Sequence, residues 1–184
     1  MPNDSDLAPL RAELEVLRAR LDTIERILQL RDAAFPPPLQ EETPAALPAT
    51  YEIGADQLLP AQDGFHQLEW GPEGAFRWTG AEGELRFEAW LDRTVPLVAT
   101  LRLFHLGTPA NARDMTIEAD GASLPLHRDG TSKVFHSDPI PPRPGAGPTI
   151  LVVRVPHLHC PADQGMSDRR TLGVAFQALR LDPA

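Results

Sequence analysis

The 184-residue sequence predicts an all-β antiparallel sandwich or jelly roll, preceded by an N-terminal helix that forms a parallel coiled coil. Three observations lead to this fold class. Apolar residues near the N-terminus recur at alternating spacings of three and four, a proline-rich stretch follows, and period-two patterns broken by glycine and proline fill the rest. The expected parts are an oligomerisation helix over residues 1–34, a linker over 35–50 and a β-sandwich domain over 51–184.

The N-terminal helix carries a heptad seam. Its a and d positions hold Leu7, Leu10, Leu14, Leu17, Leu21, Ile24 and Leu28. A helix packed on the domain's own core would show a wider apolar stripe, whereas positions e and g here are charged almost throughout. The g-to-e′ pairs, among them Glu13 with Arg18 and Arg20 with Glu25, match only between parallel helices in register. Self-association is therefore favoured over packing within the chain.

The seam also indicates how many helices associate. Leucine at a with isoleucine at d disfavours a simple dimer. The segment from Arg20 to Glu25 resembles the trimerisation pattern of short parallel coiled coils, which is Arg, apolar, two spacers, apolar, Glu. Arg20 at g would reach Glu25 at e of the next helix, while its aliphatic stem covers the core. We expect a homotrimer, with a tetramer as the alternative.

A proline-rich linker follows the helix. Pro36, Pro37 and Pro38 lack an N–H donor, and Phe35 before them is pushed out of the helical region, so the helix should end near Ala34. Residues 35–50 then form a semi-rigid spacer. A parallel bundle sends its spacers out of one end, so the β domains would face the same way.

The β domain is expected to be built from short strands. The expected strands are residues 67–70, 75–79, 84–90, 97–106, 115–119, 123–126, 150–156 and 172–181. Asp120-Gly121 should form a tight hairpin turn, and Asp129-Gly130 marks a second turn. Because no convincing helix interrupts the series, the pattern is typical of an antiparallel sandwich or jelly roll.

Charge and composition restrict the classes of partner that the protein could bind. The formal net charge of −9 argues against nucleic acid as a partner, and no stretch is long enough for membrane insertion. The N-terminus is acidic and leads into an amphipathic segment, so we expect cytoplasmic synthesis without a signal peptide. If the protein acts outside the cell, we expect lysis or a dedicated route, such as release as part of a particle.

Two sequence patterns together resemble a known module. The first is Gly64 to Trp70 with Phe76 to Gly80, and the second is Asp168 to Val174 before the last strand. They resemble the small β-sandwich accessory module of bacterial glycosyltransferases and other surface-polysaccharide proteins, over roughly residues 63–181. The resemblance implies a carbohydrate-binding domain. The chain departs from the family's usual context because a coiled coil stands where the transferase would be.

Catalytic and metal-binding motifs are sparse. The sequence has no Gly-x-Ser-x-Gly elbow, no glycine-rich phosphate loop and no His-Glu-x-x-His, so we expect no enzyme and no cofactor. His157 and His159 could share one face of a strand and clamp zinc or nickel with Asp163 or Cys160. Because prolines bracket the segment as a loop, we interpret these histidines as solvent-facing, and we expect no metal.

The aromatic residues suggest a sugar-binding surface. Trp78 and Trp90 sit among apolar neighbours and are expected in the core, whereas Trp70 precedes Gly71-Pro72 and should lie at the surface. The polar residues expected beside Trp70 are His66, Glu69 and Arg77. A structural alternative is that Asp168 and Arg169 pair with Arg77 and Glu69 to lock the two ends of the domain.

Two long loops form a second candidate surface. Residues 107–113 and 139–148 are the longest irregular stretches, and loops at the end of a sandwich often carry specificity. The polar residues there are Thr108, Asn111, Arg113 and Arg143.

Two functions are compatible with these patterns. The first is a non-catalytic trimeric glycan-binding protein that recognises a cell-surface or extracellular polysaccharide. The second is a structural or assembly component, such as a phage-like spike or a scaffold subunit, whose β domain docks on a protein partner. The aromatic and polar mixture near Trp70 favours the glycan-binding protein.

Overall fold

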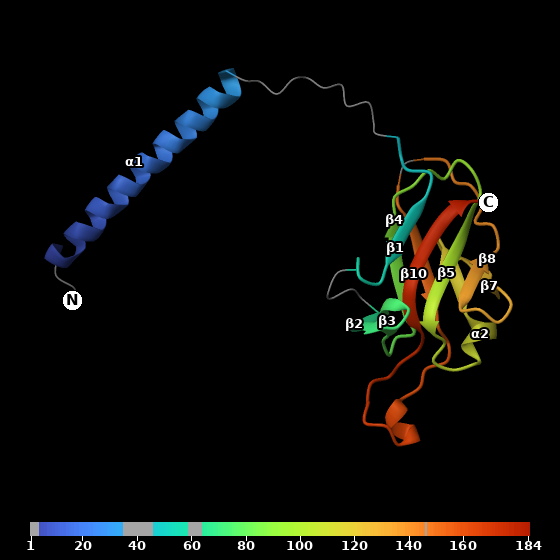
Figure 1. Ribbon diagram of the computed structural model, residues 1–184. Coiled ribbons are helices and arrows are strands. Elements are labelled where there is room, and N and C mark those ends of the chain that lie inside the picture. Colours follow the sequence, from blue (N-terminus) through green and yellow to red (C-terminus); the bar gives the residue numbers. More distant parts are fainter. Residues whose placement is uncertain (1–3, 35–45, 59–63, 146) are drawn as a thin grey trace. The chain divides into compact units, whose positions relative to one another are not determined.

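The computed structural model describes residues 4–34, 46–58, 64–145 and 147–184, with side chains of the N-terminal helix described for residues 13–28. The chain divides into two compact units, Met1–Ala45 and Ala46–Ala184 (Figure 1). Most of the expected linker and the side chains of Leu7 and Leu10 lie outside the described residues.

The first unit is one helix, α1, over Asp4–Ala34. Its end agrees with the expected stop before the prolines. The five seam side chains that are described are all exposed in the single chain: Leu14, Leu17, Leu21, Ile24 and Leu28. No helix in the described ranges combines the length and apolarity needed to cross a membrane.

The second unit is an antiparallel β fold, as the sequence predicts. Its described strands are β1 Tyr51–Gly54, β2 Phe65–Gly71, β3 Gly74–Thr79, β4 Glu84–Ala89, β5 Leu97–His105, β6 Thr116–Ala119, β7 Ala122–Arg128, β8 Val134–Ser137, β9 Thr149–Arg154 and β10 Ala175–Pro183. Two short helical turns interrupt them, α2 at Asn111–Asp114 and the 3₁₀ turn η1 at Pro161–Gln164.

The strands form one continuous sheet in the order β2-β3-β10-β5-β8-β7-β6-β9-β4, with β1 paired to β10. Strand β7 belongs to both halves, because Ala122 to Pro125 pair with β6 and Leu126 to Arg128 pair with β8. One half therefore contains β3-β10-β5-β8 and the other β4-β9-β6-β7. Every recorded pairing is antiparallel.

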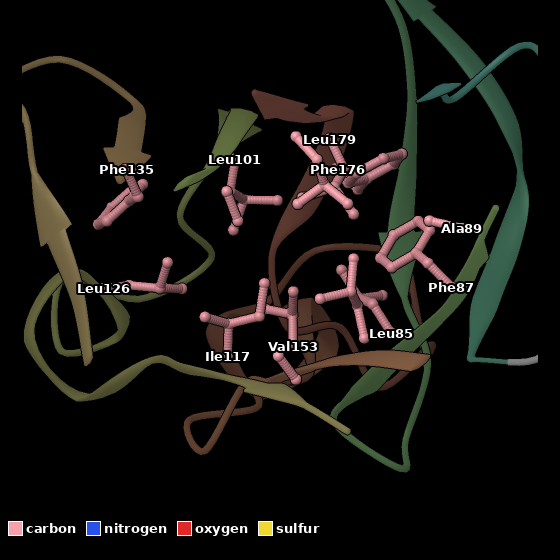
Figure 2. Packing of buried hydrophobic residues seen from close by; sticks show 14 of the residues in the cluster. Leu85, Phe87, Ala89, Leu101, Ile117, Leu126, Phe135, Val153, Phe176 and Leu179 are labelled. Atoms are coloured by element: carbon pink, nitrogen blue, oxygen red, sulfur yellow. The ribbon is translucent and has the colours of Figure 1, made fainter. Parts of the chain in front are cut away.

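The core lies between the two halves of the sheet. Phe176 and Leu101 from one half and Leu85 and Val153 from the other are fully buried and belong to one cluster (Figure 2). Along β5, buried residues alternate with partly or fully exposed ones as period-two patterning requires. This alternation gives β5 an outer face, which carries the candidate site below.

The expected hairpin turn at Asp120-Gly121 is confirmed. Ala119 pairs directly with Ala122, so Asp120 and Gly121 form the whole turn. Asp120 and Gly121 have φ of 50° and 86°, which are the positive values that a type I′ turn needs. The second expected turn also exists, closed by the Asp129 N–H donating to the Val134 carbonyl.

The sequence missed two strands and extended another too far. β1 and β8, each four residues long, were not expected. The last strand starts at Ala175 rather than at residue 172. Leu172 instead forms an isolated bridge with His159, and the Val174 N–H donates to the Thr79 hydroxyl.

Candidate functional site

Trp70 lies at the surface, as predicted. Its side chain is 72% exposed at the end of β2, opposite Ala75 of β3. Glu69 lies opposite Phe76, and adjacent residues of a strand point to opposite faces. Trp70 and Glu69 therefore do not share one face, so the predicted grouping of these two side chains around a sugar is wrong.

Glu69 belongs to a charged cluster that closes the loop before β10 onto β2. Arg170 Nη1 donates to Glu69 at 2.7 Å, and Arg170 Nη2 donates to Asp168 at 2.7 Å. His66 Nε2 lies 3.0 Å from the Thr171 carbonyl oxygen. β2 and the loop before β10 are locked together here, but not by the predicted pairs: Arg170 binds both Glu69 and Asp168, while Arg169 is exposed. Two predicted sugar contacts, His66 and Glu69, are thus engaged within the domain.

The Asp168 cluster should make stability depend on pH. Hydrogen bonds from the Arg170 side chain and backbone lower the pKa of Asp168 from 3.8 to about 2. Since the folded pKa is depressed, this carboxylate stabilises the fold above its ordinary pKa, and the contribution is lost as the pH falls through the folded value. We expect Asp168→Asn to lower the melting temperature at neutral pH, with the difference from wild type vanishing between about pH 4 and about pH 2.

The control is Asp163→Asn, on the same loop. Asp163 is exposed, and its side chain makes no hydrogen bond among the residues the structure describes. Its melting curve should follow wild type at every pH. A constant gap between Asp168→Asn and wild type down to about pH 2 would contradict the assignment.

Two of the predicted sugar contacts are buried and serve the fold. Arg77 is 3% exposed, and it donates to the carbonyls of Ala55 and Leu58, each at 3.0 Å. Asn111 is fully buried, and its amide bonds the backbone of Leu106 and His157. Their prediction as surface contacts is therefore wrong.

In the second candidate surface, residues 107–113 and 139–148, the side chain of Arg143 is held by hydrogen bonds and an ion pair within the domain. Arg143 donates to the Gly147 and Pro148 carbonyls within its own loop and pairs with Asp120 at 3.1 Å. Arg113 in α2 is exposed. The remaining polar residue of this predicted surface, Thr108, lines the groove described below.

Trp90 is not in the core. It is 52% exposed, and its Nε1 donates to Glu88 at 2.9 Å. The buried residues near it, Phe87 and Ala89, occupy alternate positions, so period two turns Trp90 outward with Glu88. Trp78 is half-buried. The prediction that both tryptophans fill the core is therefore wrong for Trp90.

The weak metal candidates do not converge. His157 Nε2 lies 2.6 Å from Asp114, whereas the His159 ring packs edge-on against Trp78. Asp163 is exposed in η1. Among the described residues, no group of three histidine, cysteine or acidic side chains could hold a metal.

A groove on the outer face of β5 was foreseen only at one edge, where the predicted loop over residues 107–113 contributes Thr108. It consists of two adjoining hollows of about 450 and 270 Å³ that share Thr131 and Lys133. We call it the β5 groove; its main polar residues are Glu73, Arg102, His105, Thr108, Arg128, Thr131, Ser132, Lys133 and Gln177. They come from the β2–β3 turn, β5 and the turn after it, the end of β7, the β7–β8 loop and β10.

The β2–β3 turn is held over β5 by close packing. Gln177 Nε2 of β10 donates to the Glu73 carbonyl at 2.6 Å. A Cβ on Gly71 would stand 2.5 Å from the Phe104 ring, so only glycine lets the turn lie this close. These two contacts position the Glu73 carboxylate at one wall of the β5 groove.

Aromatic stacking supports the same wall. The rings of Phe104 and Phe76 stack at 4.3 Å with an angle of 4°, and Trp78 meets Phe76 edge-on at 6.3 Å. Lys133 Nζ lies 5.2 Å from the centre of the Phe104 ring and 3.4 Å from Glu73. The ammonium group is therefore fixed between a carboxylate and a π face.

The remaining charged groups of the β5 groove differ in how they are held. Arg128 donates to the Ser132 and Thr131 carbonyls at 2.6 and 2.7 Å, which shapes the β7–β8 loop. Burial, followed by the nearby charges of Lys133 and His159, lowers the pKa of His105 below its ordinary value. In the described part of the chain, the Arg102 side chain has no hydrogen bond or ion pair.

Sequence reasoning missed the rest of the β5 groove because its residues are scattered along the chain. Glu73 and Gln177 are 104 positions apart, yet they touch. Two signals pointed toward it: Lys133 is the only lysine in the chain, and Arg102 alternates with the apolar Leu101 and Leu103.

No protein-family model and no curated protein matches this chain. The resemblance to the accessory module of glycosyltransferases therefore stays a prediction.

Proposed function

We propose that this chain is a non-catalytic glycan-binding protein in which an α1 homotrimer displays jelly-roll domains. The strand order supports the jelly roll, because sheets ordered β3-β10-β5-β8 and β4-β9-β6-β7 have the interleaved connections of two Greek keys. The seam of α1 supports self-association, since its five described apolar side chains are exposed in a single chain.

The β5 groove is the observation that supports glycan binding. Sugar hydroxyls both donate and accept hydrogen bonds, so a sugar site needs both kinds of group side by side. Here Glu73 offers an acceptor, Arg102 and Lys133 offer donors, and the Gln177 amide and the Thr131 hydroxyl offer both. We therefore place the sugar in the β5 groove, and Trp70 becomes a second and separate candidate.

The experiment is a glycan-array screen of the full-length protein and matched variants. We expect Glu73→Ala with Thr131→Ala to weaken binding by about tenfold, because an acceptor and a hydroxyl are lost. Glu52→Ala, which removes an exposed carboxylate on β1, should bind like wild type. Trp70→Ala separates the two candidates: loss of binding there with no loss in the Glu73 variant would move the site to Trp70.

The second candidate function is protein docking. Trp90 and Ile150 are exposed on the outer side of the neighbouring β4 and β9, with Ile150 paired to Glu88. Apolar side chains gathered on a surface favour a protein partner. If no glycan binds the folded full-length protein, this structural or assembly role becomes the better explanation.

A further inference from the structure

We propose that the ligand of the β5 groove is an acidic saccharide whose sugars carry a carboxylate. This inference rests on the proposed function and adds the chemical class of the ligand. It is supported by the charge of the β5 groove, by an uncommitted arginine and by the fixed position of the only lysine.

The charge of the β5 groove is opposite to that of the chain. The protein has 17 basic and 26 acidic residues, which gives a net charge of −9. The lining of the β5 groove has three cationic side chains, Arg102, Arg128 and Lys133, against the single carboxylate of Glu73. Because an acidic surface repels anions, a local excess of positive charge marks the place where an anionic ligand would bind.

Arg102 is the group best suited to a carboxylate. Its neighbours along β5 are buried, so the strand fixes its backbone while its side chain points outward into the β5 groove. The guanidinium has no recorded partner within the described ranges. A planar guanidinium matches a carboxylate with two parallel hydrogen bonds, which gives both affinity and orientation.

Lys133 supplies a second, fixed cation. It lines both hollows and lies between Glu73 and the Phe104 ring. Glu73 offsets part of the positive charge, which leaves a moderate excess that suits one carboxylate per sugar better than dense sulfation. Glu73 also remains an acceptor for a sugar hydroxyl, a group that polysulfated chains offer less often.

The test compares each acidic polysaccharide with a neutral form of itself. Polygalacturonate, alginate and hyaluronate are each measured beside their carboxyl-reduced forms, with neutral dextran and dextran sulfate as references, on the full-length protein. We expect at least one uronate polymer to bind about tenfold or more tightly than its reduced form. Binding should weaken as ionic strength rises, because exposed charges are screened by salt.

Two substitutions test whether the preference for the acidic polysaccharide arises in the β5 groove. Arg102→Gln and Lys133→Gln should each remove most of the preference for the acidic form. Arg180→Gln is the matched control, since Arg180 is an exposed arginine on the adjacent strand β10 that does not line the β5 groove. Melting curves should show that all three variants fold.

The outcomes separate this inference from the proposed function. If neutral glycans bind and carboxyl reduction changes nothing, glycan binding stands and the acidic ligand is overturned. General charge attraction would explain the binding if dextran sulfate binds as tightly as the uronate polymers, or if Arg180→Gln and Arg102→Gln weaken binding equally. Either result would also overturn the acidic ligand. If no saccharide binds the folded protein, the glycan-binding function and this inference both fail.

Discussion

Phe176→Ala is expected to lower the free energy of unfolding of the β unit by about 4 kcal/mol. Phe176 is fully buried, and its ring lies 5.4 Å from that of Phe65 and 5.2 Å from that of Phe87. Removing the ring loses its transfer free energy and leaves a cavity between the two halves of the sheet (Figure 2). Urea denaturation followed by tryptophan fluorescence measures the change.

A matched phenylalanine on the outer face serves as the control. Phe104 is only partly buried and packs on one side against Phe76. We expect Phe104→Ala to lower the free energy of unfolding clearly less than Phe176→Ala does, because solvent can fill the space left by the ring. Equal losses for the two variants would contradict the placement of the core between the two halves.

The second large effect should come from the α1 seam. We expect Leu21→Asp with Ile24→Asp to convert the oligomer to a monomer, because two carboxylates per helix would be buried in its core. Light scattering would then report the mass of one chain in place of three. If three glycan sites act together, the same variant should lower overall avidity by about 10²–10⁴ without touching the β unit.

The control variant keeps the same charge change off the seam. Val16→Asp with Thr23→Asp alters α1 at two heptad positions that face away from the predicted core. It should keep the oligomeric mass and the avidity of wild type. A wild-type mass of one chain would refute the coiled coil, and a mass of two chains would refute the trimer.

Local sequence patterns predicted much of the fold. The eight expected strands each overlap an observed one, because alternating apolar residues mark a half-buried strand wherever it pairs. The Asp120-Gly121 turn was also predictable, since it needs positive φ at two adjacent residues. The strands β1 and β8 were not predicted. β1 pairs with β10 at the far end of the β unit, which no local pattern reveals, whereas β8 pairs with β7 across the expected Asp129-Gly130 turn and was overlooked.

The candidate site was much less predictable than the fold. Period two tells which residues share a face, but it does not tell which polar residues the rest of the chain covers. Arg77 and Asn111 look like surface groups in the sequence, yet they are buried, where they donate hydrogen bonds to carbonyls of distant segments. Glu69 looked like a ligand contact, and Arg170 engages it instead.

The sequence by itself determined the local character of the two parts: a helix with a heptad pattern before the prolines, and a β unit with defined turns. These features depend on spacing over a few residues, which the chain carries locally. Only the tertiary structure brought Glu73, Arg102, Lys133 and Gln177 into one groove. Their meeting depends on the order in which strands pair, and that order is set by packing between segments far apart in the chain.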